Sequence, residues 1–266
     1  MPYVNNQGVR IYYEVEGQGP PLMLAHGGTG SLDAWRQSGY TDALRGEFRL
    51  ILFDARGHGR SDRPHEASIS TMADDAIAVL DSVSVTRAYY WGYSMGSAIG
   101  FDLAVRYASR FRGFILGGIS PYRWPEAMVE PLRATLEAFR LRLTDPEAYL
   151  KLTEGFFRRP LTPEERRELL ARDAEADIAL LSALINRRPF TDQDLTGIAA
   201  PCLLYCGDKD PYHDGARESV VHMPKARFVS LADLNHGTVT ADVVLPHVKE
   251  FLAEETNTQT ITGRPG

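Results

Sequence analysis

Short apolar runs alternate with helical patterns along most of this chain, and this alternation constrains the fold more than any other feature. The apolar runs have the length and residue types of buried β-strands. They lie within residues 9–16, 21–27, 48–57, 87–92, 111–120, 201–207 and 226–231. Patterns with helical spacing occupy residues 69–83, 97–108, 214–223 and 240–255. Because continuous apolar strands that alternate with helices are buried on both sides, the sequence predicts an α/β protein with a mostly parallel sheet covered by helices on both faces.

The pattern breaks once, over residues 121–195, which contain no convincing strand and are mostly helical in pattern. Two helix starts are visible in this segment. D-P-E-A begins at Asp145, and T-P-E-E begins at Thr162. Pro163 stands at the first helical position of the second helix, and Glu165 completes a capping box with Thr162. We therefore expect a helical insertion in the α/β domain.

These patterns divide the chain into three predicted parts. Residues 1–120 and 196–255 form the core domain, and residues 121–195 form the helical insertion. Residues 256–266 are polar and are expected to be a flexible tail. The whole chain of 266 residues is long enough for one large α/β domain.

Composition excludes several classes of protein. The formal net charge of -6 argues against general binding to nucleic acids or to anionic membranes. No apolar run approaches the roughly 18 residues of a membrane span. The first residues lack a basic flank and an apolar stretch, so we expect no secretory signal and a cytoplasmic location.

The two cysteines, Cys202 and Cys206, fall in one predicted strand. Four residues along a strand span about 13 Å, which is too far for a disulfide. Two thiols without further cysteines or paired histidines also make a poor zinc site. We expect two buried thiols in a reducing compartment.

The segment G-Y-S-M-G, residues 92–96, places Ser94 between two glycines at a junction of strand and helix. Such a turn can simply require small residues. The pattern G-x-S-x-G in this context is also typical of a nucleophile elbow, in which a strained turn exposes a serine hydroxyl at a helix N-terminus. We favour the second interpretation because the remaining catalytic groups are present in a suitable order.

A serine hydroxyl needs a base, and the base needs an orienting acid. Asp208 and Asp210 follow the strand within residues 201–207, and His236 follows the strand at residues 226–231. Both positions lie at the carboxyl ends of strands, where ligands bind in such sheets. The order serine, acid, histidine is therefore satisfied, and the residues alone leave two candidates for the acid.

An oxyanion intermediate also needs hydrogen-bond donors. The backbone N–H of Met95, directly after the serine, is one expected donor. The glycine-rich loop A-H-G-G-T-G-S follows an earlier strand and suits the second donor. We assign that role to the N–H of Gly28, with Thr29 as the alternative.

Taken together, the motifs make this chain similar to members of the α/β-hydrolase superfamily. They span most of the chain, in the order of that family: H-G-G at 26–28, D-A-R-G-H-G-R-S at 54–61, G-Y-S-M-G at 92–96, G-D-K-D-P at 207–211 and N-H-G at 235–237. The resemblance implies an eight-stranded type of sheet, with the helical insertion after the sixth strand forming a cap over the active site. It also implies Asp210, rather than Asp208, as the acid. Asn235 departs from the glycine that often precedes the histidine, and we expect this change to be harmless.

Other side chains near these motifs have weaker signals. We expect His58 to be structural, His26 to pack under the oxyanion loop, and His213 to lie on the surface. Arg56 and Asp62 could pair, although a solvated position is the default for both. Some aromatic residues are expected to line an apolar substrate pocket, although packing is favoured for each one individually. The substrate-binding candidates are Trp35, Tyr122, Trp124 and Phe156, with Phe157 and Phe190 as further possibilities.

The predicted function is a serine hydrolase that cleaves a small-molecule carboxylic ester or lactone through an acyl-enzyme, with Ser94, His236 and Asp210 as the catalytic residues. No metal or organic cofactor is required, and a monomer or a homodimer is expected. C–C bond hydrolysis, perhydrolysis and hydroxynitrile cleavage are alternative reactions on the same triad, because a fold does not determine its chemistry. An alternative of another class is a non-catalytic small-molecule receptor.

Overall fold

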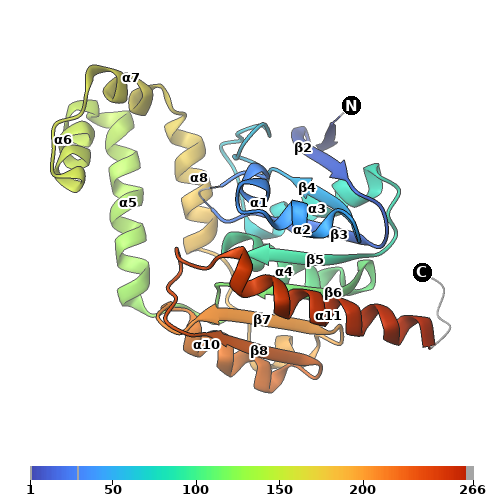
Figure 1. Ribbon diagram of the computed structural model, residues 1–266. Helices are drawn as coiled ribbons and strands as arrows, with labels where there is room; N and C mark the ends of the chain where they lie inside the picture. The colour runs from blue at the N-terminus through green and yellow to red at the C-terminus, as the bar shows by residue number, and fades with distance from the viewer. Residues whose placement is uncertain (1, 29, 262–266) are drawn as a thin grey trace. The chain divides into compact units, whose positions relative to one another are not determined.

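A computed structural model describes residues 2–28 and 30–261 of the chain. Its strands form one sheet in the order β1-β2-β4-β3-β5-β6-β7-β8 (Figure 1). The strands are β1 (Tyr3–Asn6), β2 (Val9–Glu16), β3 (Pro21–Ala25), β4 (Arg49–Phe53), β5 (Ala88–Tyr93), β6 (Phe111–Gly117), β7 (Cys202–Gly207) and β8 (Ala226–Leu231). β2 pairs antiparallel with β1 and β4, and every pairing from β4 through β8 is parallel. The predicted fold class, with a mostly parallel sheet of eight strands within the described residues, is confirmed.

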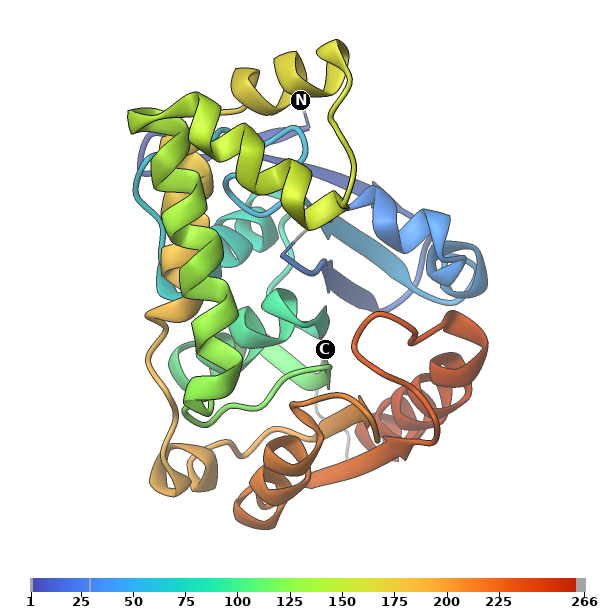
Figure 2. The same ribbon diagram turned by 90° about the vertical axis from the view of Figure 1, so that its left-hand side faces the viewer.

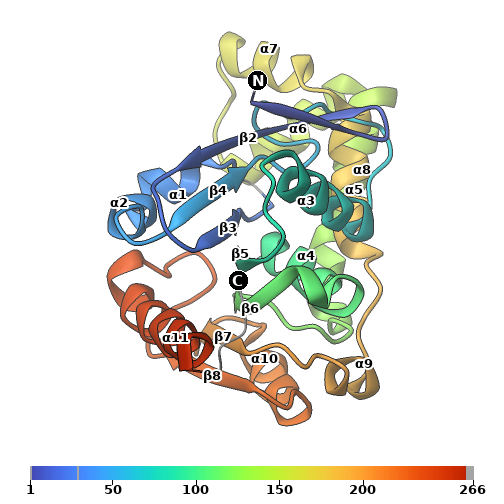
Figure 3. The same cartoon turned by 90° about the vertical axis from the view of Figure 1, so that its right-hand side faces the viewer.

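The helices of the sheet domain lie on both faces of the sheet (Figure 3). α3 and α4 pack together on one face, and α4 contacts β3, β5 and β6. On the other face of the sheet, Trp35 of α1, Leu44 of α2 and Phe251 of α11 belong to one buried cluster together with side chains of the strands. The helices of this domain are α1 (Asp33–Gln37), α2 (Tyr40–Leu44), α3 (Ile69–Ser82), α4 (Met95–Arg106), α9 (Asp192–Thr196), α10 (His213–Ser219) and α11 (Ala241–Ile261), with 3₁₀ turns η1 (Ala108–Arg110) and η2 (Val220–His222).

The central strands are buried because their apolar runs face helices on both sides. β7 is buried at all of its positions, and β3 and β4 are buried at all positions except the first. The edge strands β1 and β8 are mostly half-buried or exposed, which suits strands that are covered less completely. The parallel strands therefore deliver their carboxyl ends to one edge of the sheet from a rigid core.

A second compact unit consists of residues 63–68 and 124–187 (Figure 2). Its helices are α5 (Glu126–Thr144), α6 (Pro146–Phe157), α7 (Pro163–Ala171) and α8 (Ala174–Ile185). α5 lies beside α8, and the buried side chains of Arg142 and Asp177 form an ion pair of 2.7 Å between these two helices.

The larger part of this unit, residues 124–187, follows β6, as the resemblance implies, but the bounds of the unit differ from the expected 121–195. Residues 188–195 belong to the sheet domain, in which Tyr122 donates a hydrogen bond of 2.9 Å to Asp192. Residues 63–68 belong to the second unit, because His65 lies 3.2 Å from Asp173 within it. A role as a cap stays a prediction.

The helix starts in the second unit follow the expected capping chemistry. The side chain of Asp145 accepts a hydrogen bond from the amide of Ala148, and Thr162 and Glu165 form a complete capping box.

The C-terminal expectation is partly wrong, because α11 continues to Ile261. Residues 256–261 are therefore helical rather than a flexible tail, and residues 262–266 lie outside the described residues. Cys202 and Cys206 are free and buried, as predicted. Over residues 2–28 and 30–261, no helix combines the length and the apolar character needed to cross a membrane.

Candidate active site

Ser94 lies between β5 and α4, in a backbone conformation that residues with a side chain rarely adopt. Its φ is 53° and its ψ is -112°. Two glycines make this turn possible. A Cβ on Gly92 would lie 2.3 Å from the carbonyl carbon of Gly96, and a Cβ on Gly96 would lie 2.1 Å from the carbonyl oxygen of Ala25. Both distances are well below contact distance, so the G-x-S-x-G spacing is a steric requirement of the elbow.

The strain at Ser94 predicts an order of stability between two variants. Backbone strain of this kind costs about 1–3 kcal/mol for a residue with a Cβ, and glycine avoids most of that cost. Ser94→Gly is therefore expected to be more stable than Ser94→Ala by about 1 kcal/mol. This relief of strain exceeds the usual cost of glycine, which raises the conformational entropy of the unfolded chain. Urea denaturation of both variants measures the difference. A more stable alanine variant would contradict the strained conformation.

The side chains of Ser94, His236 and Asp210 form one chain of hydrogen bonds. His236 Nε2 lies 3.0 Å from Ser94 Oγ, and His236 Nδ1 lies 2.8 Å from Asp210 Oδ2. Because a carboxylate accepts only, Nδ1 carries the proton and Nε2 can accept the serine proton. The structure thus brings together the three residues that the sequence singled out.

Asp210, rather than Asp208, faces the histidine. Asp210 is buried, whereas Asp208 is exposed and its backbone amide bonds to Leu231 O. Burial would raise the pKa of Asp210, but hydrogen bonds from His236 and from the backbone amide of Tyr212 outweigh it and hold that pKa below its ordinary 3.8. The carboxylate therefore keeps its charge at neutral pH, where it can stabilise a protonated imidazole.

The expected oxyanion donors lie next to the nucleophile. A Cβ built on Gly28 would lie 3.8 Å from the Cβ of Met95, and one on Gly27 would lie 3.6 Å from the Cβ of Ser94. Among the described residues, neither the Gly28 nor the Met95 amide donates to another backbone carbonyl. Both are therefore suited to an incoming oxyanion. Thr29, the alternative donor, lies outside the described residues.

His26 holds the peptide that carries the Gly28 N–H. Its Nδ1 lies 2.8 Å from the carbonyl oxygen of Gly27, which also accepts a hydrogen bond from the amide of Gly30. Its Nε2 accepts a hydrogen bond of 3.1 Å from the amide of Ala55. These partners require a neutral ring that is protonated on Nδ1. Burial, with His58 nearby, lowers the pKa of His26 to about 3.

The low pKa of His26 predicts a loss of stability in acid. Between about pH 6.5 and pH 3 the unfolded chain binds a proton at this histidine and the folded chain does not. Stability therefore falls as the pH falls through that window, and below about pH 3 the effect levels off. From pH 7.5 to 4.5 the loss through His26 amounts to about 2.5 kcal/mol.

The test compares urea denaturation of the wild type and of His26→Gln at pH 7.5 and 4.5. A glutamine amide can offer a donor and an acceptor without titrating. The variant is expected to lose about 2.5 kcal/mol less than the wild type between the two pH values. Equal losses would show that His26 does not titrate in this way.

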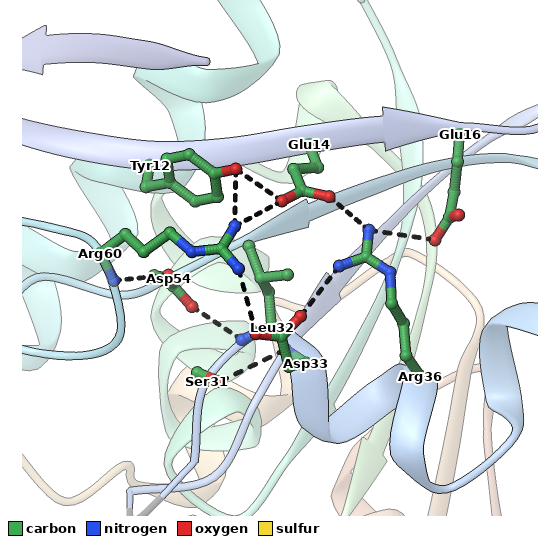
Figure 4. Close-up of polar contacts among 9 residues, drawn as sticks. All are labelled: Tyr12, Glu14, Glu16, Ser31, Leu32, Asp33, Arg36, Asp54 and Arg60. Atoms are coloured by element: carbon green, nitrogen blue, oxygen red, sulfur yellow. Dashed lines mark hydrogen bonds and ion pairs between the residues drawn. The ribbon is translucent and has the colours of Figure 1, made fainter.

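Asp54 ties the loop of Gly28 to the turn D-A-R-G-H-G-R-S. Its carboxylate accepts hydrogen bonds from the amides of Leu32, at 2.7 Å, and Arg60, at 2.8 Å (Figure 4). A Cβ on Gly59 would lie 2.2 Å from this carboxylate, so only glycine fits there. His58 adds a second link, because its Nε2 lies 2.9 Å from Gly28 O. His26 and His58 are therefore structural, as expected.

An ion cluster surrounds this link on the surface (Figure 4). Arg60 contacts Glu14 at 2.8 Å and Asp33 at 3.4 Å, and Arg36 contacts Glu14 at 2.5 Å and Asp33 at 3.0 Å. The cluster joins β2 to α1, directly after the oxyanion loop. Because the four side chains are partly exposed, each pair contributes little to stability.

The pairing considered between Arg56 and Asp62 is wrong. Arg56 is buried and pairs with buried Asp75 of α3 at 2.6 Å, while Asp62 pairs with Arg10 of β2 at 2.8 Å. A buried guanidinium needs a buried counter-ion, which Asp75 of α3 supplies here. The default of a solvated Arg56 is equally wrong.

Trp35 is not placed to bind a substrate. Its side chain is 4% exposed and packs edge-on against Tyr40 and Trp91 in the core, with ring centroids 5.3 and 5.1 Å away. The ring belongs to a buried apolar cluster of the core, so it is not available to contact a substrate.

The other aromatic candidates are divided between the two units. Tyr122 of the sheet domain is half-buried and donates to Asp192. Trp124 of the second unit is buried against the guanidinium of Arg187, 4.5 Å from its ring. Phe156 of α6 is 83% exposed within the described residues. Their roles as substrate contacts stay predictions. His213, expected on the surface, is half-buried, with Nε2 2.8 Å from Ser230 Oγ.

Two tyrosines that contact the ring of His236 were missed in the sequence. Tyr93 stacks on the His236 ring at 5.4 Å, and Tyr212 meets the same ring edge-on at 5.4 Å. Tyr93 directly precedes Ser94, and Tyr212 follows Asp210 by two positions. That proximity was the available signal, but a neighbour in a strand or turn need not point toward the site.

Comparison with known proteins identifies the family. Residues 20–237 match the family model described as the alpha/beta hydrolase fold. "Putative carbamate hydrolase RutD" of Azorhizobium caulinodans is 34% identical over 164 residues, which are 60% of this chain and only 59% of that relative. "Non-heme haloperoxidase" of Rhodococcus erythropolis is 29% identical over 95% of this chain and 99% of its own length.

A solved structure agrees with these sequence matches. The enol-lactonase of Burkholderia xenovorans LB400 superimposes with a TM-score of 0.75 at 23% identity, covering 95% of this chain and 100% of that one. The chain belongs to the α/β-hydrolase family, as its motifs implied, and the names of its sequence relatives refer to different reactions.

Proposed function

We propose that this protein is a serine hydrolase that cleaves a small carboxylic ester or lactone through a covalent acyl-enzyme. The observation that carries the proposal is the hydrogen-bonded series Ser94–His236–Asp210, in which a strained serine stands at the N-terminus of α4. A serine that only forms a turn does not require a hydrogen bond to a histidine that a buried carboxylate orients, whereas a nucleophilic serine does.

In the proposed reaction, Ser94 Oγ attacks the carbonyl carbon while His236 Nε2 takes the hydroxyl proton. Asp210 keeps the imidazole in the required tautomer and stabilises its charged form. The N–H groups of Gly28 and Met95 bind the oxyanion of the tetrahedral intermediate. His236 then protonates the leaving alcohol. In the second half of the reaction, water attacks the acyl carbonyl carbon while His236 Nε2 takes its proton, and this proton passes to Ser94 Oγ as the acid is released.

The test spans several acyl substrates, because one triad can cleave more than one kind of scissile bond. The relatives' names include a carbamate hydrolase, an enol-lactonase and a haloperoxidase, and one triad can serve all of these reactions. An ester or lactone is the proposal because acyl transfer to a serine requires no group beyond those that the site contains. A small-molecule substrate and a cytoplasmic location remain predictions of the sequence.

The experiment measures steady-state hydrolysis of p-nitrophenyl esters from acetate to dodecanoate, of a γ-lactone series and of an aryl carbamate. A fluorophosphonate that labels active serines is applied in parallel, and the labelled peptide is identified by mass spectrometry. Ester or lactone turnover with the label on Ser94 is expected. Carbamate turnover alone would overturn the substrate class, and absence of both turnover and label would overturn the hydrolase and favour a receptor.

A further inference from the structure

The side chain of Tyr93 connects the nucleophile's strand to the loop that carries the catalytic base. Tyr93 is the last residue of β5 and directly precedes Ser94. Its hydroxyl donates a hydrogen bond of 2.5 Å to the backbone carbonyl of His236. Its ring also stacks on the imidazole, with the ring centroids 5.4 Å apart and the planes at 30°.

The fold makes room for this ring at the end of β6. Gly118 has a φ of 64°, and a Cβ there would lie 2.8 Å from the Tyr93 ring. A Cβ on Gly117 would lie 2.1 Å from the ring of Tyr205, which stacks on the other ring at 6.2 Å. Two successive glycines therefore admit a pair of tyrosine rings beside the triad, and Tyr93 is the member that reaches the histidine.

His236 needs such support because its loop has no regular structure. Between β8 and α11, Asn235, Gly237 and Thr238 are exposed and bond mainly to one another. The turn that follows β7 holds the loop at Leu234, whose carbonyl accepts a hydrogen bond from the amide of Lys209. The hydroxyl of Tyr93 adds an anchor two residues further along, at the backbone of His236 itself.

We propose that Tyr93 is a positioning residue for the reaction proposed above: its hydroxyl fixes His236 relative to Ser94. The geometry forms a closed loop of contacts. It runs from Ser94 to its covalent neighbour Tyr93, through the hydroxyl to His236 O, and back through the imidazole to Ser94 Oγ. One rigid strand thereby holds the nucleophile and the backbone of its base. Small displacements of a catalytic group can cost two orders of magnitude in rate, so such an anchor affects kcat more than binding.

The test is Tyr93→Phe, which keeps the stacked ring and removes only the hydroxyl. We expect kcat for the best ester substrate to fall about 10- to 30-fold while KM changes less than threefold. The matched control is Tyr205→Phe. Tyr205 is the other ring of the pair, but its hydroxyl bonds to Trp91 Nε1 at 3.0 Å and not to the histidine. The control is expected to lower the denaturation midpoint and to leave kcat within twofold.

A second readout does not depend on turnover. The proton on His236 Nδ1, held by Asp210, is expected to give a low-field resonance in the proton NMR spectrum of the wild type. It should broaden in Tyr93→Phe and stay sharp in Tyr205→Phe. An unchanged kcat together with a sharp resonance in Tyr93→Phe would overturn the inference and leave the proposed function intact. If the wild type shows no Ser94-dependent turnover, the proposed function fails, and the resonance alone decides for or against the anchor.

Discussion

Ser94→Ala is expected to lower kcat for ester hydrolysis by about 10⁵-fold or more, because the covalent step has no other nucleophile. The residual rate should reflect only binding and the oxyanion donors of Gly28 and Met95. Folding should be little affected, since the hydroxyl of Ser94 contacts His236 and alanine keeps the Cβ at the elbow. The measurement is kcat on a p-nitrophenyl ester, with the active fraction of the wild type determined by fluorophosphonate titration.

Ser97→Ala is the matched control for this prediction. Ser97 lies one turn further along α4, and its buried hydroxyl lies 2.8 Å from both Gly92 O and Gly117 O, which share its one proton. Its loss should destabilise the elbow by about 1–3 kcal/mol, because a buried hydrogen bond to these carbonyls is lost, yet leave substantial activity. A Ser94→Ala enzyme that keeps more than about one percent of wild-type kcat would rule out the acyl-enzyme.

Asp210→Asn is expected to lower kcat by about 10⁴-fold while KM changes little. An asparagine amide can donate to Nδ1 of His236, which moves the imidazole proton to Nε2. The imidazole then offers a proton to Ser94 where it should accept one. The loss of the buried charge also removes the partner that stabilises protonated His236, which Asp210 contacts at 2.8 Å.

Asp208→Asn is the control that distinguishes this effect from a general loss of negative charge in the G-D-K-D-P turn. Asp208 is exposed two residues away, so its replacement should leave kcat within about twofold. Similar losses in the two variants would contradict the assignment of the acid. Because the pKa of Asp210 is lowered, its carboxylate stays ionised at the neutral pH of this assay.

The strongly apolar strands were predictable because burial on both faces leaves a continuous apolar run in the sequence. β1 was missed, since its four residues Y-V-N-N are half polar and pair only at the edge of the sheet. The five-residue helices α1 and α2 were also missed, because they are too short to show helical periodicity. The end of α11 was misjudged because polar residues can continue a helix that packing has already begun.

The partners of charged residues could not be derived from the sequence. Arg56 was considered with nearby Asp62, but its partner is Asp75, which α3 brings into the core from 19 positions away. The assignment of Trp35 to the substrate site failed for a similar reason, since a short helix after the oxyanion loop turns that ring toward the sheet. Sequence distance says little about which side chains the tertiary structure brings into contact.

By itself, the sequence determined the fold class, the tight turn at Ser94 and the order in which the candidate catalytic groups follow one another. Those features are local: apolar runs mark buried strands, and the close approach of backbone at Gly92 and Gly96 permits no side chain. The residues alone left Asp208 and Asp210 open, and the family resemblance implied Asp210. The tertiary structure shows that Asp210 meets His236 and that the hydroxyl of Tyr93 bonds to the backbone of His236. These contacts join residues 26 and 143 positions apart, so they depend on how parallel strands align their carboxyl ends, which no local pattern records.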